Sequence, residues 1–418
     1  MPRRHVGFVE SNRSGSGFDA LRAARTLGLH VTFFHSGLDR FHATPGGTEV
    51  LRDCVDDFVA CPTHELEPLL VAVKEVHARR PFDALLSVAD YEVVPAAEAA
   101  RQLGLPGPDP QAVRVARNKA DQRRRCAEAG VPIPAFRAVT TAEEAVRAAA
   151  EIGLPCVVKA ADETAGIHVM RCQTPADVAA GVQTVLADPT TARGQARHPE
   201  VLVEECLVGF EVSVEVLAEG TSVQVLGVTD KNLAGIDRFV EVGHTFPSAL
   251  PGPVRDELAR AAVAATRAVG FDLGMAHVEL KWTADGPKLI EINPRPAGDQ
   301  ITELMDRSLG LSTMELVIRQ YLGESVGPVD VASATGAAIR YLTACPGVVE
   351  SVAGLDVAAA VPGVREAVVS VAPGERVHEL RANDDRVGKV LAVADDPYLA
   401  GRIAEAAAQQ VAVRTRRE

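Results

Sequence analysis

The sequence lacks the features that mark several common classes of protein. None of its seven cysteines forms a C-x-x-C pair, so the usual spacing of a zinc site is absent. No stretch reaches the roughly 18 uninterrupted apolar residues of a membrane-spanning helix. The opening MPRRHVGFVES has too short an apolar run for a signal peptide. We therefore expect a cytoplasmic protein with free thiols in a reducing compartment.

Positive charge is scarce as well. The 43 Lys and Arg residues are outnumbered by 56 Asp and Glu, and the net charge is -13. This balance disfavours nucleic acid and anionic membranes as partners. A glycine is also missing: ESNRSGSGFDA contains G-x-G but not the third glycine of a dinucleotide-binding fingerprint. A turn that starts a helix is the better interpretation of this segment.

The pattern of strand and helix signals along the 418 residues predicts a multidomain protein with α/β and α+β parts. Short apolar runs alternate with helical patterns in the first third, which indicates a Rossmann-like domain with a parallel sheet. Residues 111–130 are expected to form one helix. Strand patterns dominate from about residue 200 and indicate antiparallel sheets. The predicted domains are 1–110, 111–195, 196–327 and a small β-rich part at 328–418.

The segment HVELKWTADGPKLIEIN is expected to form an acidic hairpin. A two-residue Asp-Gly loop would put Glu279 and Glu291 on opposite faces of the sheet. A three-residue loop would pair Thr283 with Pro287 and place Glu279 opposite Glu291. We favour this second register, with His277 opposite Asn293. Like charges placed opposite each other destabilise a sheet unless a cation lies between them, and Mg²⁺ prefers such oxygen ligands. Glu279, Glu291 and Asn293 are therefore the predicted metal ligands, and an ordinary solvated strand face is the alternative.

Two lysines and two glutamates add to this pattern. Lys159 ends the apolar run PCVVKAA, where an unpaired ammonium group would be costly and phosphate oxygens would suit it. Lys119 lies in ARNKADQ, and for each lysine a surface position is the alternative. Glu204 and Glu205 leave an apolar strand towards a turn at Gly209, where a backbone can pair with an adenine edge.

The order of these residues resembles that of the ATP-grasp superfamily. The sequence contains two lysines, paired glutamates and then Glu-x₁₁-Glu-x-Asn-x-Arg, which ends at Arg295. Phrases such as GLPGPDPQAVRVARNKADQ and GMAHVELKWTADGPKLIEINPRPAGDQI are most similar to the L-amino acid ligases, which join a carboxylate to an amine. The resemblance spans most of the chain and fades after about residue 345.

The resemblance implies that ATP lies between two α+β subdomains of an ATP-grasp core. Lys119 and Lys159 would then contact its phosphates, and Arg295 would face the transferred phosphoryl group and the acyl carboxylate. The remaining implied nucleotide-binding residues are Thr164, Gly166, Glu204, Glu205, Leu207, Glu211 and Lys231. Mg²⁺, with Mn²⁺ as a substitute, would occupy the three predicted ligands.

The implied reaction forms an amide through an acyl phosphate and releases ADP and phosphate. The substrates would be a small carboxylate, such as an amino acid, and an amine, in natural-product biosynthesis. His244 is expected either to orient the amine or to be structural, and Arg340 either to approach the reacting carboxylate or to form a buried ion pair. Dimers are common among such ligases, so the oligomeric state is left open between monomer and homodimer.

The segment ADETAGIHVM departs from the family pattern. Relatives carry a glycine-rich lid after the strand lysine, whereas Gly166 is the only glycine here, and Glu163 and His168 occupy positions where glycine is expected. Glycine lets a loop wrap phosphates with its amides. Two alternative functions therefore stay open: another ATP-grasp chemistry such as carboxylation of a small acceptor, and a nucleotide-binding regulator without turnover.

Overall fold

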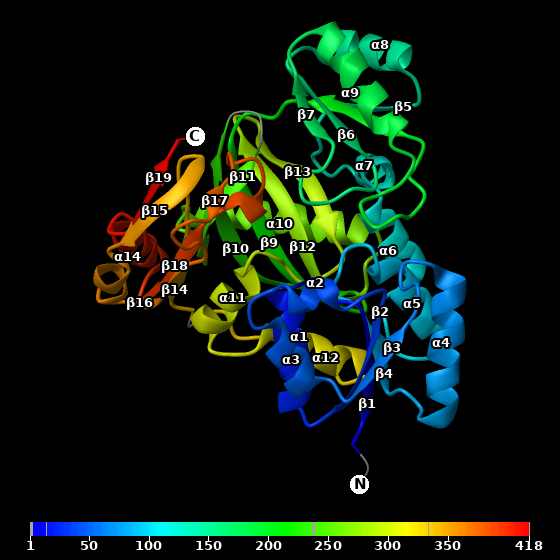
Figure 1. Ribbon diagram of the computed structural model, residues 1–418. Helices are drawn as coiled ribbons and strands as arrows, with labels where there is room; N and C mark the ends of the chain where they lie inside the picture. The colour runs from blue at the N-terminus through cyan, green and yellow to red at the C-terminus, as the bar shows by residue number, and fades with distance from the viewer. Residues whose placement is uncertain (1–2, 14, 236–238, 333, 418) are drawn as a thin grey trace.

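The N-terminal part of this computed structural model is a parallel sheet flanked by helices, as the alternating pattern predicts (Figure 1). The structure describes residues 3–13, 15–235, 239–332 and 334–417. The strands have the order β3-β2-β1-β4, and every pairing in the sheet is parallel. The elements are β1 (His5–Val9), α1 (Ser16–Thr26), β2 (His30–His35), α2 (Asp39–His42), α3 (Gly47–Cys54), β3 (Asp57–Ala60), α4 (Leu66–Arg79), β4 (Ala84–Leu86) and α5 (Val93–Gln102).

The expected single helix at 111–130 is wrong, because the chain forms two helices there. Helix α6 (Pro110–Arg117) and helix α7 (Lys119–Glu128) meet at Asn118. Asn118 has extended backbone angles (φ -104°, ψ 111°), and its side chain accepts hydrogen bonds from the amides of Ala120 and Asp121. An asparagine that caps a helix in this way satisfies amides left open at its first turn. The break places Lys119 at the start of α7.

A small antiparallel sheet follows, with the strand order β5-β8-β6-β7. Helices α8 and α9 pack against it through a core that includes Ala145, Val158 and Val182. Figure 1 shows this unit at the upper right, apart from the N-terminal sheet. Its elements are β5 (Phe136–Val139), α8 (Ala142–Ile152), β6 (Cys156–Ala160), β7 (Val169–Cys172), α9 (Pro175–Ala187) and β8 (Val201–Glu205).

The centre of the molecule is an eight-stranded sheet with the order β13-β12-β9-β10-β11-β14-β18-β16. Helix α10 (Gly252–Ala268) covers one face of it, where Val212, Val214 and Val216 are fully buried. The strands are β9 (Phe210–Glu219), β10 (Ser222–Ala234), β11 (Val240–Phe246), β12 (Leu273–Thr283), β13 (Gly286–Asn293), β14 (Gly336–Leu342), β16 (Val364–Val369) and β18 (Gly388–Ala394).

The C-terminal part continues this sheet rather than standing apart from it, because β14, β18 and β16 are three of its strands. A separate three-stranded sheet has the order β17-β15-β19. We keep the boundaries at 110, 195 and 327 as a proposal for the folding units. The remaining elements are α11 (Ile301–Leu309), α12 (Thr313–Tyr321), β15 (Gly347–Ala353), α13 (Leu355–Ala359), β17 (Arg376–Val377), a 3₁₀ turn (Asn383–Asp385), α14 (Pro397–Ala408) and β19 (Ala412–Arg416). Among the described helices, none combines the length and apolar character needed to cross a membrane.

Candidate active site

The candidate site lies on the polar face of the eight-stranded sheet. Side chains alternate between the two faces of a strand, so the valines of β9 that pack under α10 leave Glu211, Ser213 and Glu215 on the other face. Strand β12 does the same with Val278 and Leu280 in the core. The polar face therefore collects acidic and basic side chains from β9, β10, β11, β12 and β13.

The hairpin β12–β13 has the predicted facing pairs but not the predicted loop. Glu279 pairs with Glu291, and His277 pairs with Asn293, which confirms that part of the register. The three-residue loop and the Thr283–Pro287 pair are wrong, because Thr283 pairs with Gly286 and Pro287 with Trp282. An irregularity between Glu279 and Leu280 shifts the register by one residue. Such a β-bulge returns the two carboxylates to one face.

Cations neutralise Glu279 in this network. Lys231 Nζ lies 3.4 Å from Glu279 Oε1, and it also contacts Glu211 at 2.9 Å and Glu241 at 2.7 Å. Although burial acts in the opposite direction, these three carboxylates hold the pKa of Lys231 well above its usual value. His277 bridges Glu215 and Glu279 at 2.9 and 3.1 Å. Despite burial, the two carboxylates raise the pKa of His277 to about 10.

Glu291 and Asn293 complete a set of oxygen donors that fits a hard cation. Lys119 Nζ lies 2.8 Å from Glu291 Oε1. Asn293 Oδ1 is buried and has no hydrogen-bond partner among the described residues. A buried carbonyl oxygen without a donor is costly, and a metal ion would satisfy it. Two facing carboxylates with a carboxamide oxygen are the ligand type that Mg²⁺ takes, so the residues present fit the predicted ion.

The second predicted lysine and the predicted adenine hinge form a buried ion cluster. Lys159 Nζ lies 2.7 Å from Glu204 Oε2, and Arg123 Nε donates to Glu204 Oε1 at 2.8 Å. Burial lowers the pKa of Lys159 to about 8, against the pull of Glu204. The Glu204 carboxylate is thus engaged by two cations. Glu205 is instead paired with Lys288 at 2.9 Å, and Leu207 is half-buried after β8.

Arg295 is held by the N-terminal domain. Its Nε and Nη2 donate to the two oxygens of Asp90 at 2.7 and 2.9 Å. Bidentate pairs of this kind are short and directional. Although burial acts in the opposite direction, Asp90 raises the pKa of Arg295, and Glu291 and Glu279 add to that effect. Asp90 therefore determines the orientation of the guanidinium group, and the negative charges of Glu291 and Glu279 also act on it.

The loop at 162–168 is folded onto the protein through Glu163. The buried Glu163 carboxylate accepts hydrogen bonds from Tyr91 Oη at 2.6 Å, from Ala192 N at 3.0 Å and from Arg197 Nη2 at 3.0 Å. Its backbone oxygen accepts from Lys119 Nζ at 2.5 Å. Thr164 is half-buried and Gly166 is exposed at the tip. Glu163, at a position where the resemblance implies a glycine, thus ties the loop to the N-terminal domain and to the segment after α9.

His244 and Arg340 lie together on β11 and β14, farther along the same sheet. His244 is fully buried, and its Nε2 lies 2.7 Å from Asp299 Oδ2 and 3.8 Å from Glu241. Arg340 Nη1 donates to the backbone oxygen of His244 at 3.0 Å. The ligand atoms of Glu241, His244 and Asp299 are close enough to hold a metal ion. However, Arg386 also donates to Asp299, at 2.8 Å, so this carboxylate already has a cationic partner.

Sequence reasoning missed several residues that organise the site. Asp90 accepts from Arg295, Arg123 donates to Glu204, and Arg386 donates to Asp299, which is the partner of His244. The two residues of each pair lie far apart in the chain. The pattern around Asp90 carries a signal, because polar residues that follow a parallel strand gather at one edge of a sheet. Arg123 and Arg386 have no comparable signal in the sequence.

Comparison with known proteins identifies three family domains in the chain. An ATP-grasp N-terminal domain matches residues 21–107, an ATP-grasp domain matches 152–303, and the L-amino acid ligase C-terminal domain 2 matches 340–416. The third match covers the region in which the resemblance was expected to fade. It extends the likeness to the L-amino acid ligases to the end of the chain.

Individual relatives agree with these matches. The chain is 31% identical over 410 residues to an uncharacterised protein, y4rH, of Sinorhizobium fredii, with 98% of this chain and 82% of that protein covered. It is 31% identical over 259 residues to carnosine synthase 1 of Gallus gallus, with 58% of this chain but only 27% of that enzyme covered. The L-amino acid ligase of Bacillus licheniformis has the same fold over the full length of both chains, with a TM-score of 0.81 at 20% identity. The chain therefore belongs to the ATP-grasp family of carboxylate–amine ligases, which are ADP-forming enzymes that make carbon–nitrogen bonds.

Proposed function

We propose that this ligase forms an amide bond between an amino acid, or a related small acid, and an amine, through an acyl phosphate. The observation that carries the proposal is the polar face of the sheet. There two facing carboxylates, an unsatisfied carboxamide oxygen and the guanidinium group of Arg295 lie together. Phosphoryl transfer needs little from a protein beyond positioning and charge neutralisation. The two carboxylates, the carboxamide oxygen and the guanidinium group, with a bound cation, would supply both positioning and charge neutralisation.

Lys119 and Lys159 are proposed to bind the phosphates of ATP. Both ammonium groups are buried and now contact protein oxygens, those of Glu291 and Glu163 for Lys119 and that of Glu204 for Lys159. Phosphate oxygens would replace or join these partners when ATP enters. Glu204, Glu205 and Leu207 are proposed to border the adenine, and Thr164, Gly166, Glu211 and Lys231 to contact the nucleotide.

Glu279, Glu291 and Asn293 are proposed to hold Mg²⁺, for which Mn²⁺ can substitute. When bound, the ion would neutralise the developing negative charge on the phosphates. The residues themselves keep this face oxygen-rich and water-poor, and Lys231 and His277 offset the repulsion between the two carboxylates.

Arg295 is proposed to orient the substrate carboxylate towards the γ-phosphate. The carboxylate oxygen attacks phosphorus, the bond to the β,γ-bridging oxygen breaks, and ADP leaves. The amine nitrogen then attacks the acyl carbon, phosphate leaves, and the nitrogen loses a proton. Arg295 would stabilise the oxyanion of this second step. His244 and Arg340 are proposed to position the amine and the carboxylate, and His244 keeps its orientation through Asp299.

The loop at 162–168 is proposed to close over the reacting groups and exclude water. Glu163 already engages Tyr91 and Arg197, so closure is supported by side-chain contacts rather than by glycine amides. We also propose that the substrates are small molecules and that the enzyme acts in natural-product biosynthesis. Its oligomeric state is proposed to be either a monomer or a homodimer.

The test is phosphate release from ATP and Mg²⁺ across a matrix of amino acids offered singly and in pairs, with product masses measured in the positive wells. Release that requires two amino acids, with a product mass equal to their sum less water, is the expected result. Bicarbonate-dependent release without an amine would contradict amide formation in favour of carboxylation. ATP binding without release of phosphate under any condition would contradict turnover.

A further inference from the structure

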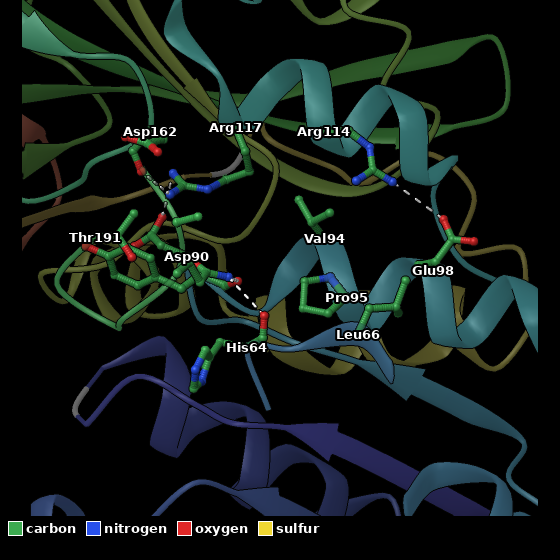
Figure 2. A pocket seen from close by; sticks show the side chains of 13 residues that line it. His64, Leu66, Asp90, Val94, Pro95, Glu98, Arg114, Arg117, Asp162 and Thr191 are labelled. Atoms are coloured by element: carbon green, nitrogen blue, oxygen red, sulfur yellow. Dashed lines mark hydrogen bonds and ion pairs between the residues drawn. The ribbon is translucent and has the colours of Figure 1, made fainter. Parts of the chain in front are cut away.

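A cavity of about 300 Å³ lies next to the candidate active site, between the N-terminal domain and the ATP-grasp core, and Asp90 and Asp162 are part of its lining (Figure 2). Its walls come from the start of α4, from α5 and α6, and from the segment at 191–196. The residues described as lining it include none of the predicted metal, nucleotide or catalytic residues. This volume lies at the lower end of the range for small-molecule sites.

Arg117 supplies a buried cation to this cavity. Its side chain is 9% exposed, and its Nη1 is buried without a hydrogen-bond partner among the described residues. The Asp90 carboxylate lies 3.7 Å from this atom, beyond a normal hydrogen bond. Asp90 itself is engaged by both donors of Arg295. A guanidinium group with a free donor in a cavity favours an anionic ligand.

Asp162 supplies an acceptor beside this cation. Its Oδ1 is also buried without a hydrogen-bond partner among the residues described, while its Oδ2 accepts from His198 N at 2.6 Å. Arg117 Nη2 donates to the backbone oxygen of Asp162 at 3.3 Å, so the two residues are adjacent, as Figure 2 shows. The nearest cation, Arg197 Nη1, is 3.5 Å from Asp162 Oδ1. The oxygen can therefore take a further donor.

One part of the cavity wall is apolar, whereas His64, Thr191 and Gln195 add polar groups elsewhere in the lining. Leu66, Val94 and Pro95 lie on the side away from Arg117 and Asp162 (Figure 2). At the rim, Arg114 faces Glu98 at 3.7 Å, so these two charges balance each other. A ligand would meet an acceptor and a donor close together at one end and an apolar surface at the other.

We propose that this cavity binds a free α-amino acid or a dipeptide with an apolar side chain, as a second site distinct from the one that carries out the reaction. The carboxylate would contact Arg117, the ammonium group Asp162, and the side chain the apolar wall. In an α-amino acid the two charged groups are joined through a single carbon atom, which suits the adjacency of Arg117 and Asp162.

The site has a direct connection to the candidate active site. Asp90 borders the cavity, contacts Arg117 and holds Arg295. A carboxylate on Arg117 would change the charge around Asp90 and with it the orientation of Arg295. Occupancy of the cavity would therefore alter turnover. This effect on turnover rests on the proposed function, whereas binding in the cavity does not.

The test is calorimetric titration of the full-length protein, without ATP, with L-leucine and L-leucyl-L-leucine. Leucinamide lacks the carboxylate, 4-methylpentanoate lacks the amine, and inorganic phosphate tests for a plain anion site. Saturable binding of leucine or its dipeptide, at least about tenfold tighter than that of either truncated probe, is expected, since each truncated probe loses hydrogen bonds between charged groups.

Two variants locate the binding site. Ala196→Trp places a large ring at the exposed part of the lining and should remove the binding site in the cavity, so that the titration shows one saturable site fewer than in the unchanged protein. Arg117→Gln should weaken binding in the cavity at least about tenfold. Ala192→Trp, on the same segment but outside the lining, is the matched control and should bind like the unchanged protein.

A number of saturable binding sites that Ala196→Trp leaves unchanged would place the ligand elsewhere and overturn the proposal, because amino acids that bind as substrates at the proposed active site stay bound in this variant. Binding of phosphate with no binding of amino acids, or no saturable binding of either amino-acid probe, would overturn it as well. Because no turnover is measured, these outcomes are independent of the phosphate-release matrix, so failure of this site is distinguishable from failure of the ligase assignment.

Discussion

The hairpin β12–β13 and the loop at 162–168 serve the same candidate site but are built in opposite ways. In the hairpin, the acidic residues Glu279 and Glu291 face each other with Lys231 and Lys119 beside them. In the loop, the carboxylate of the acidic residue Glu163 accepts a hydrogen bond from Tyr91 and anchors the segment to the N-terminal domain. A rigid strand pair suits ligands of fixed geometry, whereas a phosphate-covering loop has to move.

This difference suggests where each region is sensitive. The hairpin depends on charge at defined atoms, so small chemical changes should affect catalysis more than stability. The loop depends on a buried carboxylate with three donors, so changes there should affect stability and motion first. The following predictions test that contrast.

The largest effect is expected from Glu291→Gln in the hairpin. It removes a proposed metal ligand with little change of shape, and we expect ADP formation to fall about a thousandfold or more, because a bound ion contributes several kcal/mol to transition-state stabilisation. The measurement is the initial rate of ADP release, with circular dichroism to verify the fold. Asp285→Asn at the exposed turn of the same hairpin is the control and should keep its rate. An unchanged rate of ADP release in Glu291→Gln would contradict the proposal that Glu291 is a metal ligand.

Asp90→Asn should have the next largest effect, since it weakens the contact between the N-terminal domain and the hairpin side of the site. Loss of the bidentate acceptor leaves Arg295 in a less defined orientation, and a reduction of kcat by about 10–100-fold is expected, as for other residues that orient a catalytic group. Steady-state kinetics should show this fall in kcat with a smaller change in the KM for ATP. An effect confined to the KM for ATP would contradict a role in orienting Arg295.

Glu163→Gly should act mainly on stability. It removes the acceptor of Tyr91, Ala192 and Arg197, so the free energy of unfolding should fall by about 1–3 kcal/mol, measured by urea denaturation. Cleavage of the loop by a protease should become faster.

Ala165→Gly is the matched control on the same loop. Ala165 has a φ of 54°, which glycine adopts without steric cost, and its side chain is at the exposed tip. It should leave the unfolding free energy within about 1 kcal/mol of the unchanged protein. Equal losses in the two variants would mean that the anchoring contacts of Glu163 do not stabilise the loop.

The smallest effect concerns how the contacts that join the N-terminal domain to the segment after α9 contribute to stability at different pH values. Burial raises the pKa of Glu92 to about 7, although Arg193 opposes this shift. A carboxyl group whose pKa is raised on folding contributes stability that is fully present below its unfolded pKa and is lost as the pH rises through about 7. Arg193→Gln removes the compensating charge, so its destabilisation should be larger at about pH 8 than at about pH 5.5.

The measurement is urea denaturation of both proteins at the two pH values. When Glu92→Gln is also present, the destabilisation caused by Arg193→Gln should differ less between the two pH values. A difference that stays constant with pH in the native background would show that Glu92 is not the titrating group.

The sequence by itself determined much of the alternation of strands and helices, because alternation along a strand is a local property. It did not determine the pairing of Glu279 with Glu291: the predicted loop length was wrong, and a β-bulge restores the same pairing. The parallel N-terminal sheet follows from the same kind of local pattern. The break at Asn118 was missed although the local sequence carried a signal for it, because asparagine is unfavourable inside a helix and favoured at a helix start.

Only the tertiary structure decided which charged groups meet. Arg295 and Asp90 are 205 residues apart in the chain, and Arg123 and Glu204 are 81 apart. Such pairs depend on how separately folded units pack, which no local periodicity encodes. The sequence could therefore supply candidate side chains for the proposed chemistry, whereas the packing of the N-terminal domain against the ATP-grasp core decided how they are held, because a buried charge is stable only beside the partner that the fold brings to it.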